Sequence, residues 1–352
     1  MAALDGVRDG AVAPVRRSKD AVTRESSAEY TDSVSLAGIQ PVDLLGRHDR
    51  NLRVLEDRMP GRVVVRGDAL VLSGSEPDVQ ALKHVLTGLL ELVRQRRLLT
   101  EADVHYAIDT RGHAEAPGAL AGESILLTAK RLPVGPKTFA QRDYLRAIGA
   151  HDVVFAIGPA GTGKTYLAIA AAVAALRRRE VDRIVLARPA VEAGENLGFL
   201  PGDYQEKVDP YLRPLYDALQ ELMGDEALRR AVENGVVEVA PLAYMRGRTL
   251  RHSFAILDEA QNATLAQLKM FLTRLGPDSR AVVTGDITQI DLPQPESSGL
   301  VLVQRILRDV EGLAFVYLSD VDVVRHRLVQ RILQAFARRP PDAGDSVRSG
   351  GA

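Results

Sequence analysis

A short glycine-rich segment constrains the fold of this chain more than any other part of its 352 residues. The segment reads Gly158-Pro-Ala-Gly-Thr-Gly-Lys-Thr165 and lies between an apolar run at 153–157 and a helical pattern at 165–179. The spacing G-x-x-x-x-G-K-[ST], in the order strand, loop, helix, predicts a loop that binds phosphate. A chance glycine turn before an alanine-rich helix would explain the loop alone but not its context on both sides.

Each part of this loop has a physical reason to be there. The glycines let backbone N–H groups converge on phosphate oxygens, and the helix N-terminus adds a partial positive charge. We expect Lys164 to reach the β- and γ-phosphates of a nucleotide and Thr165 to be a ligand of Mg²⁺. The predicted nucleotide-binding residues are Gly158, Pro159, Ala160, Gly161, Thr162, Gly163, Lys164 and Thr165.

A pair of carboxylates follows a second apolar run, at 253–257. At the end of a buried strand beside the phosphate loop, Asp258 is placed to hold Mg²⁺ through water. Glu259 is placed to orient and deprotonate an attacking water. The alternative is a solvated acidic pair of the kind found at many strand ends in α/β folds. Two further strand candidates separate the motifs along the chain, so we expect the acidic strand not to be the immediate neighbour of the phosphate-loop strand.

A third polar segment follows the apolar run 281–284 and reads Gly285-Asp286-Ile-Thr-Gln289-Ile-Asp291. Gln289 is the best candidate for a γ-phosphate sensor, because its amide can donate to a phosphoryl oxygen and accept from water. The alternative interpretation is a local turn in which the side chain of Asp286 accepts a backbone N–H.

Short apolar runs alternate with helical patterns through the second half of the chain, which predicts an α/β domain with a parallel sheet flanked by helices. The N-terminal half predicts a smaller α+β unit of the order αββα, with Gly67-Asp68 in a tight hairpin. The predicted divisions are a disordered tail 1–40, the small unit 41–108, a linker 109–136, the α/β domain 137–339 and a disordered tail 340–352. The predicted strands of the α/β domain are 153–157, 183–187, 236–239, 254–257, 281–284 and 314–318, and its predicted helices are 165–179, 203–222, 264–275, 299–309 and 325–338.

Composition excludes several classes of protein. The chain has no cysteine, which rules out a disulfide scaffold, a cysteine-ligated zinc site and a thiol nucleophile. Its longest apolar run, 167–176, is about ten residues and too short to span a bilayer. The formal net charge of −1 gives no bulk positive field, so any nucleic-acid site must be a local patch.

The motifs together carry a resemblance. In this order, the phosphate loop, the acidic pair and the third segment are similar to those of superfamily-1 helicases. Over about residues 44–338 the chain more closely resembles PhoH-like ATPases. The segments that carry this closer likeness are Thr138-Phe-Ala-Gln141, Leu186-Ala-Arg-Pro189, Gly194-Glu-Asn-Leu-Gly-Phe-Leu-Pro-Gly202, Met245-Arg-Gly-Arg-Thr249, Asp258-Glu-Ala-Gln-Asn262 and Gly285-Asp-Ile-Thr-Gln-Ile-Asp-Leu292.

The resemblance implies a RecA-like domain that hydrolyses ATP with Mg²⁺, a cytoplasmic location and a role in RNA metabolism, with RNA and an RNA-processing endoribonuclease as partners and no membrane. It also implies that Gln141 lies near the adenine edge, where one amide offers a donor and an acceptor. A surface glutamine at a helix start is the alternative. The small unit resembles a partial KH-like module without a G-x-x-G loop, which favours a structural or assembly role.

One phosphate loop and one acidic strand make half of a helicase site, since superfamily-1 helicases place the nucleotide between two RecA-like domains. We therefore expect a homo-oligomeric ring, a hexamer, in which an arginine of the neighbouring copy completes each site. Arg325, in Asp322-Val-Val-Arg325-His326, is the first candidate, and Arg246 or Arg248 the second. The alternative is that Arg325 pairs with Asp320 or Asp322 of its own chain.

The sequence thus predicts an ATP-binding, Mg²⁺-dependent ATPase that couples hydrolysis to RNA remodelling or processing. A P-loop kinase of a small molecule and an ATP-dependent assembly scaffold without motor activity remain the alternatives. The predicted catalytic residues are Lys164, Asp258, Glu259, Gln289 and Arg325.

Overall fold

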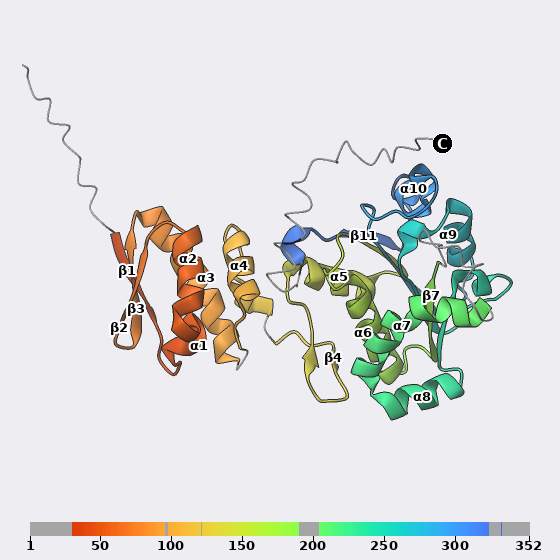
Figure 1. The fold of residues 1–352 in the computed structure, drawn as a ribbon, viewed down its shortest axis with the longest axis horizontal. Coiled ribbons are helices and arrows are strands. Elements are labelled where there is room, and N and C mark those ends of the chain that lie inside the picture. Colours follow the sequence, from red (N-terminus) through yellow and green to blue (C-terminus); the bar gives the residue numbers. More distant parts are fainter. Residues whose placement is uncertain (1–29, 96–97, 121, 190–203, 324–331, 333–352) are drawn as a thin grey trace, which may run out of the picture.

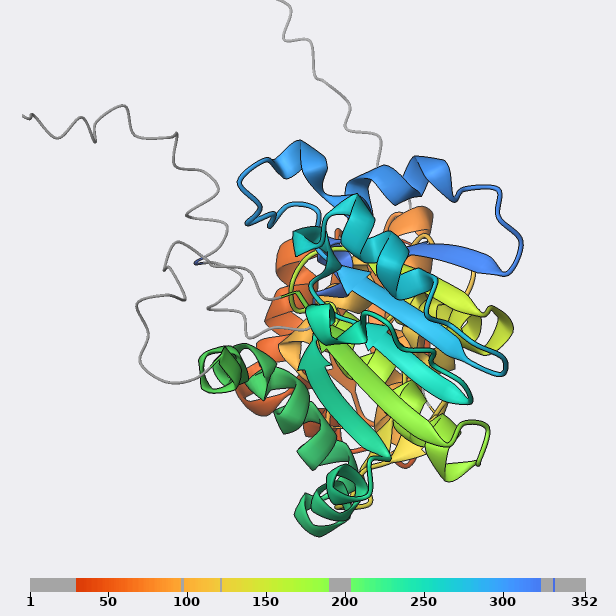
Figure 2. The ribbon, with the colours of Figure 1, turned by 90° about the vertical axis from the view of Figure 1, so that its right-hand side faces the viewer.

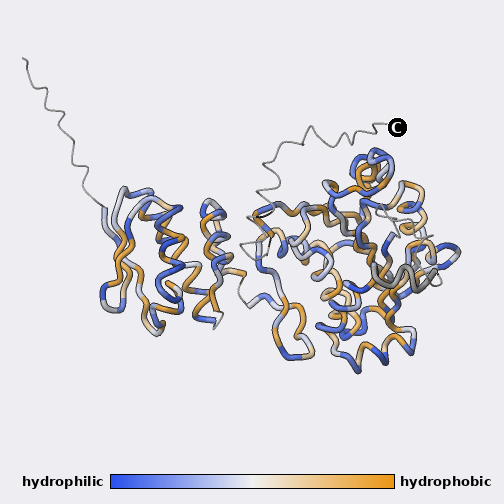
Figure 3. Tube along the Cα trace, in the orientation of Figure 1, coloured by the Kyte–Doolittle hydropathy of each residue, from blue (hydrophilic) through white to orange (hydrophobic). Residues whose placement is uncertain are grey.

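A computed structural model of the chain describes residues 30–95, 98–120, 122–189, 204–323 and 332. It places a smaller part, built from the first third of the chain, beside a larger α/β domain (Figure 1). The hydrophobic residues of both parts concentrate in their sheets and on the inner faces of their helices (Figure 3). Within the described residues no helix is long and apolar enough to cross a bilayer.

The smaller part is an antiparallel sheet in the order β1-β3-β2, covered on one face by helices. The predicted hairpin is confirmed, with Gly67 at φ +59° between its strands. A helix that the sequence did not predict, the last of this part, starts with a capping box between Thr100 and Asp103. The elements are β1 (Tyr30–Ser35), α1 (Pro41–Leu45), α2 (Arg50–Arg58), β2 (Arg62–Arg66), β3 (Ala69–Gly74), α3 (Glu76–Arg94) and α4 (Glu101–Asp109).

The predicted disordered tail 1–40 is wrong in its last part. Strand β1 pairs with β3 along its whole length, from Tyr30 opposite Gly74 to Ser35 opposite Ala69. Val34 is the one buried side chain of β1, so the strand has almost no apolar signature in the sequence. The predicted tails 1–29 and 340–352 lie outside the described residues.

The predicted linker 109–136 is packed rather than extended. It contains a 3₁₀ turn at Pro117–Leu120 and a two-stranded ladder of β4 (Leu126–Leu127) and β5 (Pro133–Val134). The turn lies against α3, where a Cβ on Gly118 would come within 2.5 Å of the Glu91 side chain. Leu126 and Val134 join the core of the larger domain, so this segment contacts both parts.

The larger domain is a six-stranded parallel sheet in the order β11-β6-β10-β9-β7-β8, seen obliquely in Figure 2. Helices α5 to α8 pack on one face of the sheet, and α9 and α10 pack on the other. The strands are β6 (Val153–Ile157), β7 (Arg183–Arg188), β8 (Val237–Pro241), β9 (Ser253–Leu257), β10 (Arg280–Gly285) and β11 (Leu313–Tyr317). The helices are α5 (Phe139–Ala150), α6 (Lys164–Arg177), α7 (Tyr204–Met223), α8 (Asp225–Glu233), α9 (Leu265–Leu272) and α10 (Gly299–Ile306).

The fold class is the predicted one, and the acidic strand β9 is indeed not adjacent to the phosphate-loop strand β6. The strand between them is β10, which carries the third motif: Gly285 pairs with Ile157 on one side and Val283 with Leu257 on the other. All three motifs therefore leave the sheet side by side at its carboxyl edge. The predicted helix 325–338 lies outside the described residues except for Ile332.

The two parts meet along α4 and the start of α5. The backbone N–H of Phe139 donates to the Tyr106 hydroxyl at 2.6 Å, and the His113 ring stacks on the Phe139 ring. Burial raises the pKa of Tyr106 to about 12. Arg142 donates to Glu115 at 2.6 Å, which lowers the pKa of that carboxyl.

Candidate functional site

Two glycines, Gly158 and Gly163, allow the shape of the phosphate loop. Strand β6 is buried at every residue and delivers the chain to Gly158, where a Cβ would lie 2.4 Å from the carbonyl oxygen of Leu318. Gly163 has φ +80°, a conformation that glycine adopts at little cost. Helix α6 starts immediately after it, at Lys164, so its N-terminal N–H groups are turned toward the loop.

Lys164 lies over the loop from which it comes. Its Nζ donates to the carbonyl oxygens of Gly158 at 2.6 Å and Pro159 at 2.8 Å. The side chain is almost fully buried yet lines a cavity of about 260 Å³. The ammonium group is thus held at the first residues of the loop, where phosphate oxygens would compete with the two carbonyls for it.

The two predicted metal ligands are in direct contact. The Thr165 hydroxyl donates to Oδ1 of Asp258 at 2.6 Å, across 93 positions of sequence. The hydroxyl of Thr284, at the end of β10, donates to the same oxygen at 2.7 Å. A hydroxyl and a carboxylate are the hard oxygen donors that Mg²⁺ takes together with phosphates and waters, so these residues fit that ion. Sequence analysis missed Thr284, although its place at a strand end beside the motifs was visible.

A buried tyrosine supports this pair from below. The hydroxyl of Tyr144, on α5, donates to the carbonyl oxygen of Lys164 at 3.1 Å. Burial raises the pKa of Tyr144 well above its usual value, and the nearby negative charge of Asp258 adds to the effect. Tyr144 therefore remains neutral and fixes the first turn of α6, which carries Thr165.

Glu259 lines the cavity, and both of its carboxylate oxygens have a partner. Oε1 is 3.6 Å from Nη2 of Arg188, and Oε2 accepts a hydrogen bond from Nε2 of Gln261 at 2.6 Å. The carboxylate remains about two-fifths exposed, at 38 %. The backbone of Glu259 is in the left-handed region at φ +53°, which costs of order 1 kcal/mol for a residue with a side chain.

Arg188 lies beside the acidic pair, and sequence analysis assigned it no role. It ends strand β7, next to β9 in the sheet, and its Nη1 lies 3.9 Å from Oδ2 of Asp258. The same nitrogen donates to the carbonyl oxygen of Tyr211 at 3.0 Å. The segment 186–189 had signalled a family likeness but no role for this residue.

Gln261 connects the acidic motif with the third motif. It is 1 % exposed. Besides its bond to Glu259, its Nε2 donates to the carbonyl oxygen of Gln289 and its Oε1 accepts the N–H of Asp286. A Cβ on Gly285 would meet Oε1 of Gln261 at 2.8 Å, so the glycine allows this close approach. Sequence analysis assigned Gln261 no role.

The third motif brings Gln289 to the cavity and also forms the turn that was its alternative interpretation. The Thr288 N–H donates to Oδ1 of Asp286 at 2.9 Å, which closes the predicted side-chain turn. Gln289 lines the cavity, and its Nε2 donates to Oδ2 of Asp286 at 2.9 Å. The amide NH₂ group has a second N–H, so Gln289 can donate to a phosphate oxygen while it stays bonded to Asp286.

Gln141 lies against the loop and not on the surface. It is 3 % exposed, so the alternative of a surface glutamine is wrong. Its Oε1 accepts the N–H of Lys137 at 2.7 Å, and its Nε2 donates to the carbonyl oxygen of Thr162 at 3.0 Å. Gln141 thus positions the phosphate loop, and its contact with adenine stays a prediction.

The three arginines predicted to complete the site of a neighbouring copy differ in their surroundings. Arg325 lies outside the described residues. Arg248 forms a two-bonded ion pair with Glu238, with one contact at 2.6 Å, and this partner raises the pKa of the guanidinium. Arg246 is exposed on the turn after β8. Among the described residues no group of three or more His, Asp or Glu is arranged to hold a metal ion.

A parallel sheet with a phosphate loop on one strand, an acidic pair on another and a polar third segment between them defines the P-loop nucleoside triphosphatases. The chain belongs to the PhoH family: residues 133–337 match the family model described as "PhoH-like protein". The family predicted from the motifs is therefore confirmed.

The relatives extend the likeness beyond the larger domain. A PhoH-like protein of Synechocystis sp. is 52 % identical over 84 % of this chain and 91 % of its own length. A PhoH-like protein of Bacillus subtilis is 46 % identical over 85 % of this chain and 95 % of its own. Protein PhoH of Escherichia coli is 47 % identical over 58 % of each chain. A Sulfolobus solfataricus SWI2/SNF2 ATPase core aligns at a TM-score of 0.31 and 12 % identity over 50 % of this chain and 42 % of its own, a likeness too weak to support an argument.

Proposed function

We propose that this chain is an ATP-binding, Mg²⁺-dependent ATPase that couples hydrolysis to RNA remodelling or RNA processing. The observation that carries the proposal is the 2.6 Å hydrogen bond between Thr165 and Asp258. It joins the phosphate loop to the acidic strand within one cavity, where Lys164 and Glu259 also lie. A metal ligand pair, a cation for phosphates and a carboxylate beside them are the parts that phosphoryl transfer requires.

The residues divide the chemistry between them. Lys164 exchanges its two loop carbonyls for phosphate oxygens and neutralises part of their charge. Thr165 and Asp258 hold Mg²⁺, which when bound supplies Lewis-acid neutralisation of the phosphate oxygens. Glu259 orients the attacking water and accepts its proton. Gln261 and Arg188 hold the Glu259 carboxylate in place for that step.

Water is the acceptor that this arrangement favours. Glu259 lines the same cavity as Lys164 and is partly exposed, so its carboxylate can accept a proton from a water molecule there. A small-molecule kinase would need an additional acceptor pocket. An assembly scaffold that uses ATP without a motor function would keep the same site but would not respond to RNA.

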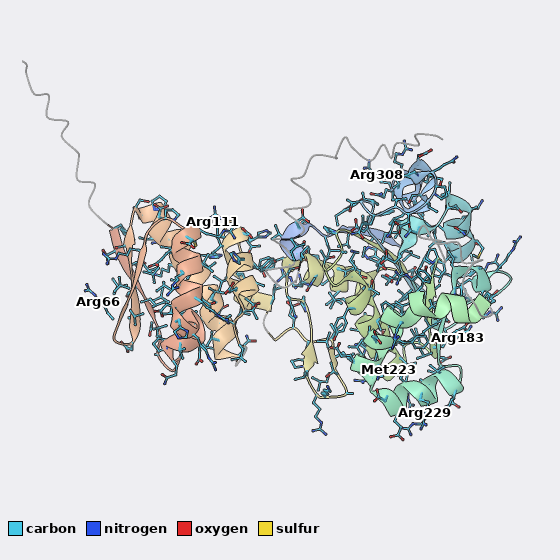
Figure 4. All side chains as sticks on the ribbon, in the orientation of Figure 1. Arg66, Arg111, Arg183, Met223, Arg229 and Arg308 are labelled. Carbon is cyan, nitrogen blue, oxygen red and sulfur yellow. The ribbon has the colours of Figure 1, made fainter. Side chains whose placement is uncertain are left out.

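RNA would contact a local surface rather than a general basic field. The labelled arginines Arg66, Arg111, Arg229 and Arg308 are spread over both parts of the molecule in Figure 4. Arg246 is an exposed cation that follows the carboxyl end of β8 after one 3₁₀ turn, and it is a candidate for such a contact. An RNA-processing endoribonuclease is the proposed protein partner, and the cytoplasm the proposed location.

A homo-oligomeric ring, a hexamer, is the proposed assembly, with Arg325 of one copy completing the site of the next. Arg325→Ala and Lys164→Ala subunits, each inactive alone, test this when they are mixed. Mixed rings should recover part of the activity, because some interfaces pair an intact loop with an intact arginine. Absence of recovery, or full activity of a monomer in sedimentation, would refute the shared site.

The proposed function is tested by phosphate release from ATP and Mg²⁺, with and without single-stranded RNA, with Lys164→Ala as the control. Stimulation by RNA supports the coupling. Hydrolysis that RNA does not change favours the scaffold, and transfer of phosphate to a metabolite favours the kinase. Absence of nucleotide binding would overturn the assignment as a whole.

A further inference from the structure

The phosphate loop carries an internal anion. Oδ2 of Asp286, a residue of the third motif, accepts the backbone N–H of Ala160 with 3.1 Å between nitrogen and oxygen. Backbone N–H groups of this loop are the donors that a phosphate requires. One of them is therefore already bonded to a carboxylate of the chain itself.

The carboxylate is firmly held in this position. Asp286 is 4 % exposed and accepts three further hydrogen bonds. The N–H and the hydroxyl of Thr288 donate to Oδ1 at 2.9 and 2.6 Å, and Nε2 of Gln289 donates to Oδ2 at 2.9 Å. Four donors therefore satisfy the buried carboxylate and offset the cost of removing it from water.

Asp286 meets the loop at the same end as Lys164. The ammonium group of Lys164 binds the carbonyl oxygens of Gly158 and Pro159, and Asp286 binds the N–H of the next residue, Ala160. Lys164 is the group aimed at the outer phosphates of a nucleotide. The outermost phosphate therefore approaches a loop end where a carboxylate already accepts the available N–H, and both residues line the same cavity.

We propose that Asp286 lowers the affinity of the site for nucleoside triphosphates relative to diphosphates. Its carboxylate occupies the position of the outermost phosphate at the N–H of Ala160, and only a triphosphate has to displace it. This inference rests on the proposed function. A diphosphate fills the inner part of the loop and leaves the Asp286 contact intact, whereas the third phosphate competes with it directly. Nε2 of Gln289, which donates one N–H to Asp286, can donate its second N–H to that phosphate.

The displaced segment is also tied to Glu259. Gln261 accepts the N–H of Asp286 and donates to both the carbonyl oxygen of Gln289 and the carboxylate of Glu259. Glu259 activates water, and it is connected to the Asp286 turn by one buried side chain, that of Gln261. A shift of the turn therefore moves Glu259. Displacement of Asp286 by the third phosphate would therefore change the position of Glu259 through Gln261.

The test compares two nucleotides on three variants. Affinities for ADP and for the non-hydrolysable β,γ-imido analogue of ATP are measured by titration calorimetry with Mg²⁺. In Asp286→Asn, the amide oxygen can keep the Thr288 bonds while its NH₂ group faces the loop, where it repels the Ala160 N–H and can donate to phosphate. We expect the analogue to bind about tenfold more tightly and ADP to change less than about twofold, since loss of one close negative charge is worth at least that factor.

Asp291→Asn is the matched control, because it neutralises a carboxylate of the same segment that bonds Asn262 and not the phosphate loop. Its affinity ratio should equal that of the unsubstituted chain. Asp286→Ala serves as the second variant if Asp286→Asn does not fold, and should shift the ratio in the same direction. Equal changes for both nucleotides, or weaker binding of the analogue alone, would overturn the inference. Failure of the unsubstituted chain to bind either nucleotide would instead overturn the proposed function.

Discussion

The two parts of the molecule bury polar side chains in very different ways. In the described residues of 30–109, Asn51 is the buried polar side chain, and its amide donates to the carbonyl oxygen of Leu44 to join two helices. The larger domain buries many more, and those at the carboxyl edge of its sheet form hydrogen bonds with residues of the same edge. They are Thr162, Lys164, Asp258, Gln261, Asn262, Thr284 and Asp286.

This contrast identifies where chemistry can occur. Burying a polar group costs free energy unless hydrogen bonds replace water, so a fold accumulates such groups only where they satisfy one another or serve a ligand. The interior of the smaller part is an apolar core around Leu70, Leu82 and Leu86. Its contribution is therefore expected to be architectural, and substitutions in the two parts should differ in what they change.

The largest effect is expected for Lys164→Ala. The substitution removes the ammonium group that lies at the first residues of the loop, and with it the charge aimed at the outer phosphates. ATP hydrolysis should be abolished and nucleotide binding weakened, as measured by phosphate release and by titration with a fluorescent nucleotide. An unchanged turnover rate would contradict the assignment of the site.

Glu259→Gln should lower turnover by roughly two orders of magnitude while ATP still binds. The amide keeps the size of the side chain and its contact with Gln261 but cannot accept the proton of water. Single-turnover hydrolysis and ATP affinity separate the two effects. If the variant fails to bind ATP, Glu259 is a binding residue and the division of roles with Asp258 is incorrect.

Arg188→Gln should lower kcat by about tenfold and leave the KM for ATP within about twofold, because Arg188 acts through the Glu259 carboxylate. Arg188→Lys keeps the charge and should recover part of the loss. Arg183→Gln is the matched control, since Arg183 lies on the same strand at the far end from the cavity. A fall in kcat of equal size in the control would mean that strand β7 is merely destabilised.

The smallest effect on turnover, below about twofold, is expected for Tyr106→Phe at the contact between the two parts. The lost hydroxyl leaves the N–H of Phe139 without its acceptor, which costs about 1 kcal/mol of stability. A larger loss of turnover would show that the smaller part affects the phosphate loop through α5, which contacts both.

The stability difference at Tyr106 should also depend on pH. Burial raises the pKa of Tyr106 from 10.0 to about 12. A raised pKa stabilises the folded state below pH 10, and this contribution is lost as the pH rises toward 12. The difference in unfolding free energy between the unsubstituted chain and Tyr106→Phe, measured with denaturant, should therefore narrow as the pH rises from 10.0 toward about 12. A difference that stays constant across this range would mean that the hydroxyl is not buried in solution.

The sequence predicted the elements that carry local signals. The strand, loop and helix around Lys164 follow from glycine spacing and apolar periodicity, and the contact of Thr165 with Asp258 follows from two motifs at the same sheet edge. Arg188, Gln261 and Thr284 were missed because their roles depend on which strands are neighbours. Strand β10 lies between β6 and β9, and no local pattern specifies that order.

Strand β1 was not predicted for a related reason. Its residues carry almost no apolar pattern, and the strand forms because its backbone pairs with β3. The consequence concerns protein production. An expression boundary placed at Pro41, where the first helix begins, would remove β1 and leave unpaired the backbone groups of β3 that face it between Ala69 and Gly74. It would also remove Val34 from the core that contains Leu70 and Leu72. An unpaired apolar edge of this kind recruits strands from other molecules, so a truncated clone is expected to yield inclusion bodies where one that starts before Tyr30 yields monodisperse protein.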